Sequence, residues 1–177
     1  MIEDWKNEIV TMVYVKQELM KLDVKGIWPH HFPEIAAIEE QIIEVEEGLG
    51  HSLDKSYQNF LKSANGWKGF YQTVDLFGTS ELLGSSAMDY AYTILAAIED
   101  DIIESTGFSR EELLPIATTR YDKDLFVISR PGSHSPGIVI WFAGEEIDRF
   151  PNFEKYFLAM VDYNRLMVER MQKKQKG

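Results

Sequence analysis

The sequence predicts an α+β protein: N-terminal helices, an antiparallel sheet meander with a helical insertion, and a C-terminal helix packed on the sheet. Three observations support this fold class. Apolar residues recur at helical spacing in the first third of the chain and again at its end. The short apolar runs between these regions are joined by compact turns, which favour antiparallel pairing because parallel pairs need long crossovers. The 177 residues are 45% apolar, enough for one domain with a substantial core.

The first helix is expected over residues 2–22, where apolar side chains recur three and four positions apart. Gly26, Pro29 and Pro33 then predict a loop over residues 24–33. We expect a single domain over residues 1–177, in which residues 1–33 form a helical extension.

Two shorter helices are expected next. Residues 34–47 carry one apolar stripe, and Gly48 and Gly50 end the pattern. Asp54 is a suitable N-cap for a helix over residues 55–64, because its carboxylate can accept a backbone N–H of the first turn. The stripe of the first of these helices consists of Ile35, Ile38, Ile42, Val45 and Leu49.

The sheet is predicted from short strands separated by turn residues. A helical insertion over residues 86–104 interrupts them, and a final helix is expected over residues 152–171. The basic tail, residues 169–177, is expected to fray. The predicted strands cover residues 70–77, 114–118, 125–129, 137–143 and 146–149.

Motifs that carry chemistry are missing from the sequence. Without cysteine the chain has no disulfide, thiol nucleophile or Cys-based metal site. No Gly-x-Ser-x-Gly elbow and no Gly-rich phosphate loop are present. His30 and His31, with Glu34 nearby, could contribute to a metal site, but the flanking prolines favour a surface loop. We therefore predict a non-enzymatic protein with no catalytic, cofactor-binding or metal-ligating residue.

The chain is strongly acidic, with 29 Asp and Glu against 18 Lys and Arg and a net charge of -11. This balance argues against a nucleic-acid partner, because phosphate binding requires clustered cations. No apolar run approaches the ~18 residues that a membrane span needs, so no membrane partner is expected. The first residues are acidic and resemble no signal sequence, and we expect a cytoplasmic protein.

The acidic residues are unevenly distributed. Residues 34–54 and 69–109 each contain seven acids and no Lys or Arg, whereas residues 169–177 hold four bases and one acid. Such segments serve solubility in many proteins. They are also typical of a surface that attracts a basic protein, because negative potential accelerates the approach of that partner.

One segment has a specific spacing of apolar, acidic and glycine residues. It resembles the signature of the SMI1/KNR4 family, in the SUKH superfamily: an apolar residue before Glu, then Leu-Gly, Leu-Pro, Tyr, Phe-Leu and Asn-Gly. Asp54 replaces the usual Pro, and both residues suit the start of a helix. The later strands and the closing helix match more loosely, so the resemblance covers about residues 35–158. The pattern is Ile42-x-x-Val45-Glu46-x-x-Leu49-Gly50-x-x-Leu53-x-x-x-Tyr57-x-x-Phe60-Leu61-x-x-x-Asn65-Gly66.

The resemblance implies a binding module. Bacterial members of the superfamily are largely immunity proteins, which bind and neutralise the toxin domain of a polymorphic secreted toxin, often a nuclease. The yeast members are interaction proteins in cell-wall signalling. A compact chain without long disordered flanks is closer to the bacterial members. The implied partner is a cognate toxin, expected to be basic, and the protein itself is expected to be a monomer or a weak homodimer.

The partner-binding surface is expected among acidic side chains and two aromatic anchors. The acids also suit a solvated helix face, and the aromatics also suit the core. Two other functions stay open: a regulatory scaffold of the same family that binds another cellular protein, and a metal-dependent hydrolase that uses the histidines. The expected contact residues are Trp67, Tyr71, Asp89, Glu99, Asp100, Asp101 and Glu104.

Overall fold

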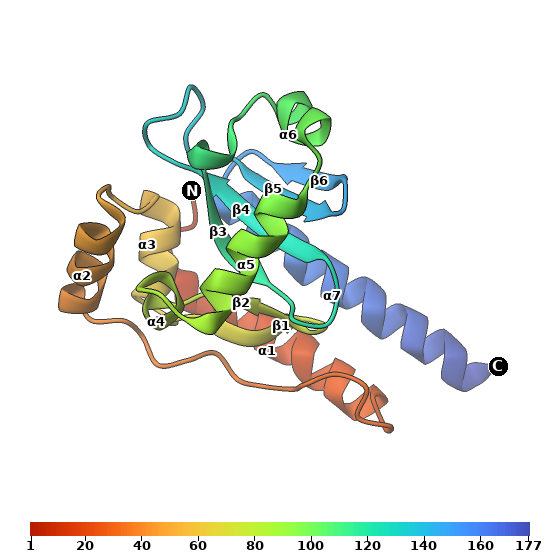
Figure 1. Ribbon diagram of the computed structural model, residues 1–177. Coiled ribbons are helices and arrows are strands. Elements are labelled where there is room, and N and C mark those ends of the chain that lie inside the picture. The colour runs from red at the N-terminus through yellow and green to blue at the C-terminus, as the bar shows by residue number, and fades with distance from the viewer.

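The computed structural model describes residues 1–177 and contains seven α-helices, one 3₁₀-helix and a single six-stranded sheet (Figure 1). No helix combines the length and the apolar character that crossing a bilayer requires. The elements in chain order are α1 (Trp5–Leu22), α2 (Glu39–Leu49), α3 (Lys55–Leu61), β1 (Trp67–Tyr71), β2 (Val74–Leu76), α4 (Thr79–Leu82), α5 (Ser86–Ala97), α6 (Asp100–Thr106), η1 (Arg110–Glu112), β3 (Leu113–Thr118), β4 (Asp124–Ser129), β5 (Val139–Ala143), β6 (Glu146–Phe150) and α7 (Phe153–Lys176).

The predicted α+β class and antiparallel meander are confirmed. The strands lie in the order β1-β2-β3-β4-β5-β6, and every neighbouring pair is antiparallel. The segment containing α4, α5 and α6 is inserted between β2 and β3. Helix α5 crosses one face of the sheet, whereas α1 and α7 pack together on the other face (Figure 1). Because both faces are covered, all six side chains of β3 are buried.

The core is densest where α1, α3 and α7 meet. The ring of Trp5 lies 5.5 Å from that of Phe60 and 5.3 Å from that of Phe157, both in edge-on geometry. Tyr57 stacks on Phe153 at 4.7 Å, and its hydroxyl donates to the carbonyl of Phe77 at 2.6 Å. Burial raises the pKa of Tyr57, so this hydroxyl stays protonated and keeps the hydrogen bond. The N-terminal helix is therefore an integral part of the core.

The Asn65-Gly66 dipeptide of the motif closes a tight junction with the end of β2. The Asn65 side chain donates to Thr79 Oγ1 and accepts the Thr79 N–H, both at 2.8 Å. Gly66 has φ +93°, and a Cβ there would lie 2.6 Å from the nitrogen of Gly78. Only glycine fits this backbone approach. These residues therefore fix where the chain leaves α3 and enters the sheet.

The predicted helix over residues 34–47 is wrong in its first turn, because α2 begins at Glu39. Residues 34–37 lie outside the helix and are bonded to the end of α3 and to the segment that follows it: the Ala37 N–H donates to Leu61 O, and the Glu34 N–H donates to Gly66 O. Ile35 is 91% exposed, so it does not belong to a buried stripe. Long-range backbone hydrogen bonds here override a local helical pattern.

Larger differences from the prediction occur at three further places. Residues 70–77 are not one strand but contribute to the hairpin of β1 and β2, whose turn includes Gln72 at φ 54°. The helix predicted over residues 86–104 breaks at Ile98, which has an extended ψ of 134°, into α5 and α6. The basic tail continues α7 to Lys176, and Gln175 Nε2 donates to the carbonyl of Leu22 at 3.1 Å.

A matched pair of substitutions tests the orientation of α2. Ile42 is fully buried, whereas its neighbour Ile43 is 48% exposed. We expect Ile42→Ala to lower the free energy of unfolding by about 2–5 kcal/mol, because it leaves a cavity. Ile43→Ala is expected to change the free energy of unfolding by less than about 0.5 kcal/mol. Urea denaturation of both variants measures the difference, and equal losses would contradict this placement of α2.

Candidate partner-binding surface

All five acidic residues predicted to contact a partner are exposed, but they form two groups. Glu99, Asp100, Asp101 and Glu104 lie on α6 and its N-cap, and we call them the acidic α6 surface. Asp89 lies in the first turn of α5, about 12 Å of helix before the end of α5 at Ala97, whereas Glu99 follows the break at Ile98. The structure therefore brings four of the five acids together.

The N-terminal end of α6 is braced by Arg110, which follows it in the chain. The guanidinium donates to Asp100 Oδ1 at 2.6 Å and to the carbonyl of Leu95 at 3.1 Å, and it also contacts the carbonyl of Ile98. These carbonyls end α5 and have no partner within that helix. Arg110 thus stabilises the break between α5 and α6 and fixes the direction in which α6 leaves the sheet.

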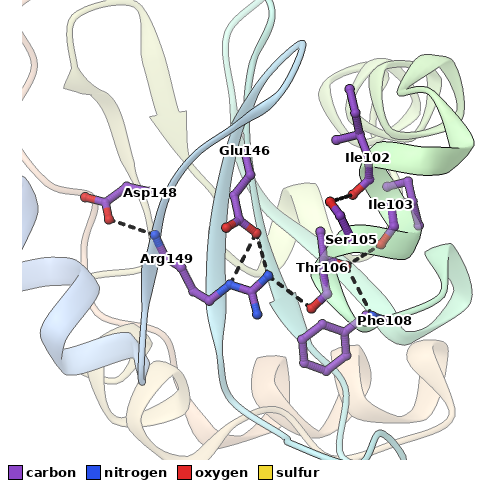
Figure 2. A network of polar contacts seen from close by, with 8 residues as sticks. All are labelled: Ile102, Ile103, Ser105, Thr106, Phe108, Glu146, Asp148 and Arg149. Atoms are coloured by element: carbon purple, nitrogen blue, oxygen red, sulfur yellow. Dashed lines mark hydrogen bonds and ion pairs between the residues drawn. The ribbon is translucent and has the colours of Figure 1, made fainter.

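The C-terminal end of α6 is braced from β6 by Arg149 (Figure 2). Its guanidinium donates to the carbonyl of Thr106 at 3.0 Å and to Glu146 Oε1 at 2.5 Å. The Thr106 hydroxyl donates to the carbonyl of Ile103 at 2.6 Å and accepts the N–H of Phe108 at 3.1 Å. These contacts satisfy carbonyls at the end of the helix and tie α6 to the edge strand.

Strand β6 is itself held against α7. The Tyr163 hydroxyl donates to Asp148 Oδ2 at 2.8 Å, and Asp148 Oδ1 accepts the N–H of Arg149 at 2.8 Å. Burial, assisted by the hydrogen bond to Asp148, raises the pKa of Tyr163 to about 12. The hydroxyl therefore remains a donor at neutral pH, and the contacts extend from α7 through β6 to α6.

A groove of about 420 Å³ lies between α6 and η1. Asp100, Glu104 and Glu111 contribute carboxylates to its lining, and Arg110 is the one cation there. The buried side chains of Ile103 and Phe108 also line it. An open groove with three carboxylates and an apolar component suits a lysine or arginine side chain, whose stem is apolar and whose head is cationic.

Trp67 and Tyr71 do not lie on this surface, so the expectation that they are aromatic anchors for a partner is corrected in favour of the core alternative. Trp67 is 1% exposed, and its Nε1 donates to the carbonyl of His31 at 3.0 Å. Tyr71 is 7% exposed and packs edge-on against Trp141 and Tyr163. Both aromatics belong to β1, which is covered by the helical layer, so they serve the core and are not available to a partner in this structure.

The histidine pair is held in the loop by hydrogen bonds. His30 Nε2 lies 2.7 Å from Asp23 Oδ2, whereas the His31 carbonyl accepts Trp67 Nε1. Glu34 is exposed in the extended segment that follows. Residues 1–177 contain no group of three or more His, Asp or Glu side chains placed to hold a metal ion.

Arg110, Arg149 and Glu111 belong to this surface but are not among the contact residues expected from the sequence. Arg110 lies within Ser109-Arg110-Glu111-Glu112, in which the Ser109 N–H donates to Glu112 Oε2 at 2.8 Å. This capping-box spacing could have indicated a helical turn immediately after Gly107. The contact of Arg149 joins residues 43 positions apart, and no local pattern predicts it.

The Arg149 brace can be tested by local hydrogen exchange. We expect Arg149→Met to lower the free energy of opening of α6 by about 1 kcal/mol, which corresponds to roughly fivefold faster amide exchange. Arg165→Met is the matched control, because Arg165 also forms an i,i+3 ion pair and makes no contact with α6. Exchange followed by mass spectrometry reports both variants, and unchanged exchange in α6 of Arg149→Met would contradict the brace.

Comparison with known proteins agrees with this architecture. The model of the SMI1 / KNR4 family (SUKH-1) matches residues 36–159, which is more than half of the chain. The matched region contains the motif from Ile42 to Gly66, the complete sheet and the acidic α6 surface. No curated protein matches the chain significantly. The match to the family shows that this chain belongs to the SMI1/KNR4 (SUKH-1) family.

Proposed function

We propose that the protein is an immunity protein, which binds a cognate toxin through the acidic α6 surface and thereby neutralises it. Membership of the SMI1/KNR4 family supports a non-catalytic binding module of the immunity or SMI1/KNR4 type. The observation that carries the proposal is an exposed acidic helix, braced at both ends by arginines and bordered by a groove.

The charge on α6 is available to a partner. Glu99, Asp101 and Glu104 form no ion pair within residues 1–177, whereas Asp100 is paired with Arg110. Exposed carboxylates of this kind contribute little to folding. They attract cations over about a Debye length, roughly 8 Å at physiological salt. An approaching basic protein would therefore associate faster with this end of the molecule.

A toxin that acts on nucleic acid has the complementary chemistry. A nuclease needs cationic side chains where it holds phosphates, and carboxylates can occupy the same positions. The bracing of α6 would reduce the entropy that is lost on binding, because the carboxylates already share one rigid helix. The groove beside α6 would receive one lysine or arginine of the toxin. Occupying the phosphate-binding cleft would block the toxin without any reaction.

A regulatory scaffold of the SMI1/KNR4 type would use an acidic surface in the same way, but its partner would be a resident cellular protein. The two functions differ in where the partner is encoded. An immunity protein requires the toxin gene beside its own, because the producing cell needs both products together.

Co-expression tests the proposed function directly. We expect the product of the neighbouring gene to stop growth when it is expressed alone in a host. Growth should return when the present protein is expressed with it, and the two proteins should purify as one complex. A neighbouring product that is harmless, or one that kills equally well with the protein present, would contradict the immunity function.

Charge reversal tests the surface. We expect the double variant Asp101→Lys and Glu104→Lys to reduce the association rate constant with the toxin about 10–100-fold and to flatten its dependence on salt. The control, Glu40→Lys with Glu44→Lys on the exposed face of α2, changes the net charge equally. Stopped-flow kinetics distinguishes the two pairs. Equal rate losses in both variants would show that only net charge matters and would move the interface away from α6.

A further inference from the structure

A second pocket, of about 370 Å³, lies between α5 and η1. Arg110 and Glu111 contribute to the lining of this pocket and also to that of the groove beside α6, so the two adjoin each other. A partner that occupies the groove beside α6 would therefore cover this pocket as well. The lining of the pocket consists of Tyr92, Leu95, Ala96, Arg110, Glu111 and Arg130.

Arg130 is a half-buried cation without a counter-charge. Its guanidinium forms no ion pair within residues 1–177. It donates instead from Nη1 to His51 Nε2 at 2.8 Å and from Nη2 to the Tyr92 hydroxyl at 3.0 Å. His51 Nδ1 lies 2.9 Å from the carbonyl of Ser52, which only accepts, so Nδ1 carries the ring hydrogen and Nε2 is the acceptor. The positive charge of Arg130 therefore has only uncharged hydrogen-bond partners.

The guanidinium of Arg130 is fixed before any ligand binds. The backbone N–H of Arg130 donates to the carbonyl of Glu112 at 2.8 Å, and its carbonyl accepts the hydroxyl of Ser133 at 2.7 Å. Nε is buried and has no partner, so a ligand does not reach it. The two terminal nitrogens each have two hydrogens and use one of them, which leaves one donor at Nη1 and one at Nη2.

Tyr92 places a further donor directly beside this guanidinium. Its oxygen accepts from Arg130, and its own hydroxyl hydrogen has no acceptor within residues 1–177. The residue is 38% exposed and lines the pocket. Because the hydroxyl oxygen lies only 3.0 Å from Nη2, the free hydrogens of both groups can reach one carboxylate.

The other charges of the lining do not compensate Arg130. Arg110 is already paired with Asp100. Glu111 is the one acid in the lining; it is exposed and forms no ion pair. Glu111 also lines the groove beside α6, where a lysine or arginine of a partner would neutralise it. Arg130 would then remain as an unmatched positive charge at the centre of the contact, which is costly unless the partner supplies an anion.

We infer that the pocket between α5 and η1 binds an aspartate or glutamate carboxylate of the protein partner, which accepts hydrogen bonds from Arg130 Nη2 and the Tyr92 hydroxyl. This inference rests on the proposed function, because it concerns the partner that occupies the groove beside α6. That partner presents a cation and a carboxylate side by side. The requirement for both signs of charge discriminates against basic proteins that offer cations alone.

A titration of the free protein with a blocked glutamate, N-acetylglutamate N-methylamide, tests the pocket without a toxin. The buried Nε–H of Arg130 is the reporter in nitrogen–proton correlation spectra. We expect a saturable shift with the blocked glutamate and none with the equally blocked glutamine, which has the same shape but no charge. Inorganic phosphate forms the third arm. Tighter saturation by phosphate would identify a general anion site and would overturn the assignment to a protein carboxylate.

Variants followed through the amide resonances of α5 separate binding from folding. Arg130→Met should abolish the response to the blocked glutamate. Tyr92→Phe keeps the ring, removes the hydroxyl donor and should weaken binding about fivefold, so it decides the matter if Arg130→Met does not fold. Arg120→Met is the matched control and should bind normally, because Arg120 also donates to an uncharged hydroxyl, that of Ser86 at 2.7 Å, and forms no ion pair.

The absence of saturation, an equal response to the blocked glutamine, or unchanged affinity in Tyr92→Phe would overturn the inference. Such a result would leave toxin neutralisation, as scored by co-expression, unaffected. A failed co-expression would contradict the immunity function but would not alter the titration of the free protein. The two failures are therefore distinguishable.

Discussion

The close backbone approach between Asn65-Gly66 and Gly78-Thr79 positions the sheet and the helices that are inserted into it. The two backbone segments approach so closely that a side chain at Gly66 would collide with Gly78. The Asn65 amide fixes the approach through two hydrogen bonds to Thr79. This junction sets the end of α3, the start of β1 and the end of β2 at once. The meander and the inserted helices that follow are positioned from it, and so are the acids on α6.

Sequence reasoning succeeded where local chemistry decides the structure. Asp54 accepts the N–H of Tyr57 at 3.0 Å as an N-cap, and Gly50 ends α2 in the left-handed conformation. Prediction from the sequence fails where contacts between residues far apart in the chain determine the structure. Ile35 follows a helical pattern but is exposed, because the backbone around it bonds to the end of α3 and to Asn65 and Gly66 beyond it. Trp67 suits either a contact surface or the core by its sequence, because sequence alone does not show which layers cover β1, and it is buried.

The candidate site also combines features that local sequence predicts with features that only long-range contacts produce. The acids of α6 could be named from the sequence, because a segment without Lys or Arg is visible by inspection. What makes them a defined surface is long-range: Arg149 reaches the carbonyl of Thr106 from β6. The bracing matters physically, because carboxylates on a fixed helix lose less conformational freedom on binding than those on a mobile loop. The proposed immunity function therefore combines a charge that composition reveals with a rigidity that only the fold supplies.

The most direct test of this account is a hydrogen-exchange footprint of the complex with the product of the neighbouring gene. The amides of α6 and of the following segment to η1 should exchange more slowly in the complex than in the free protein, while the amides of α2 should be unchanged. Protection confined to α2 or to another part of the molecule would contradict the assignment of the acidic α6 surface as the binding site, as would the absence of a complex.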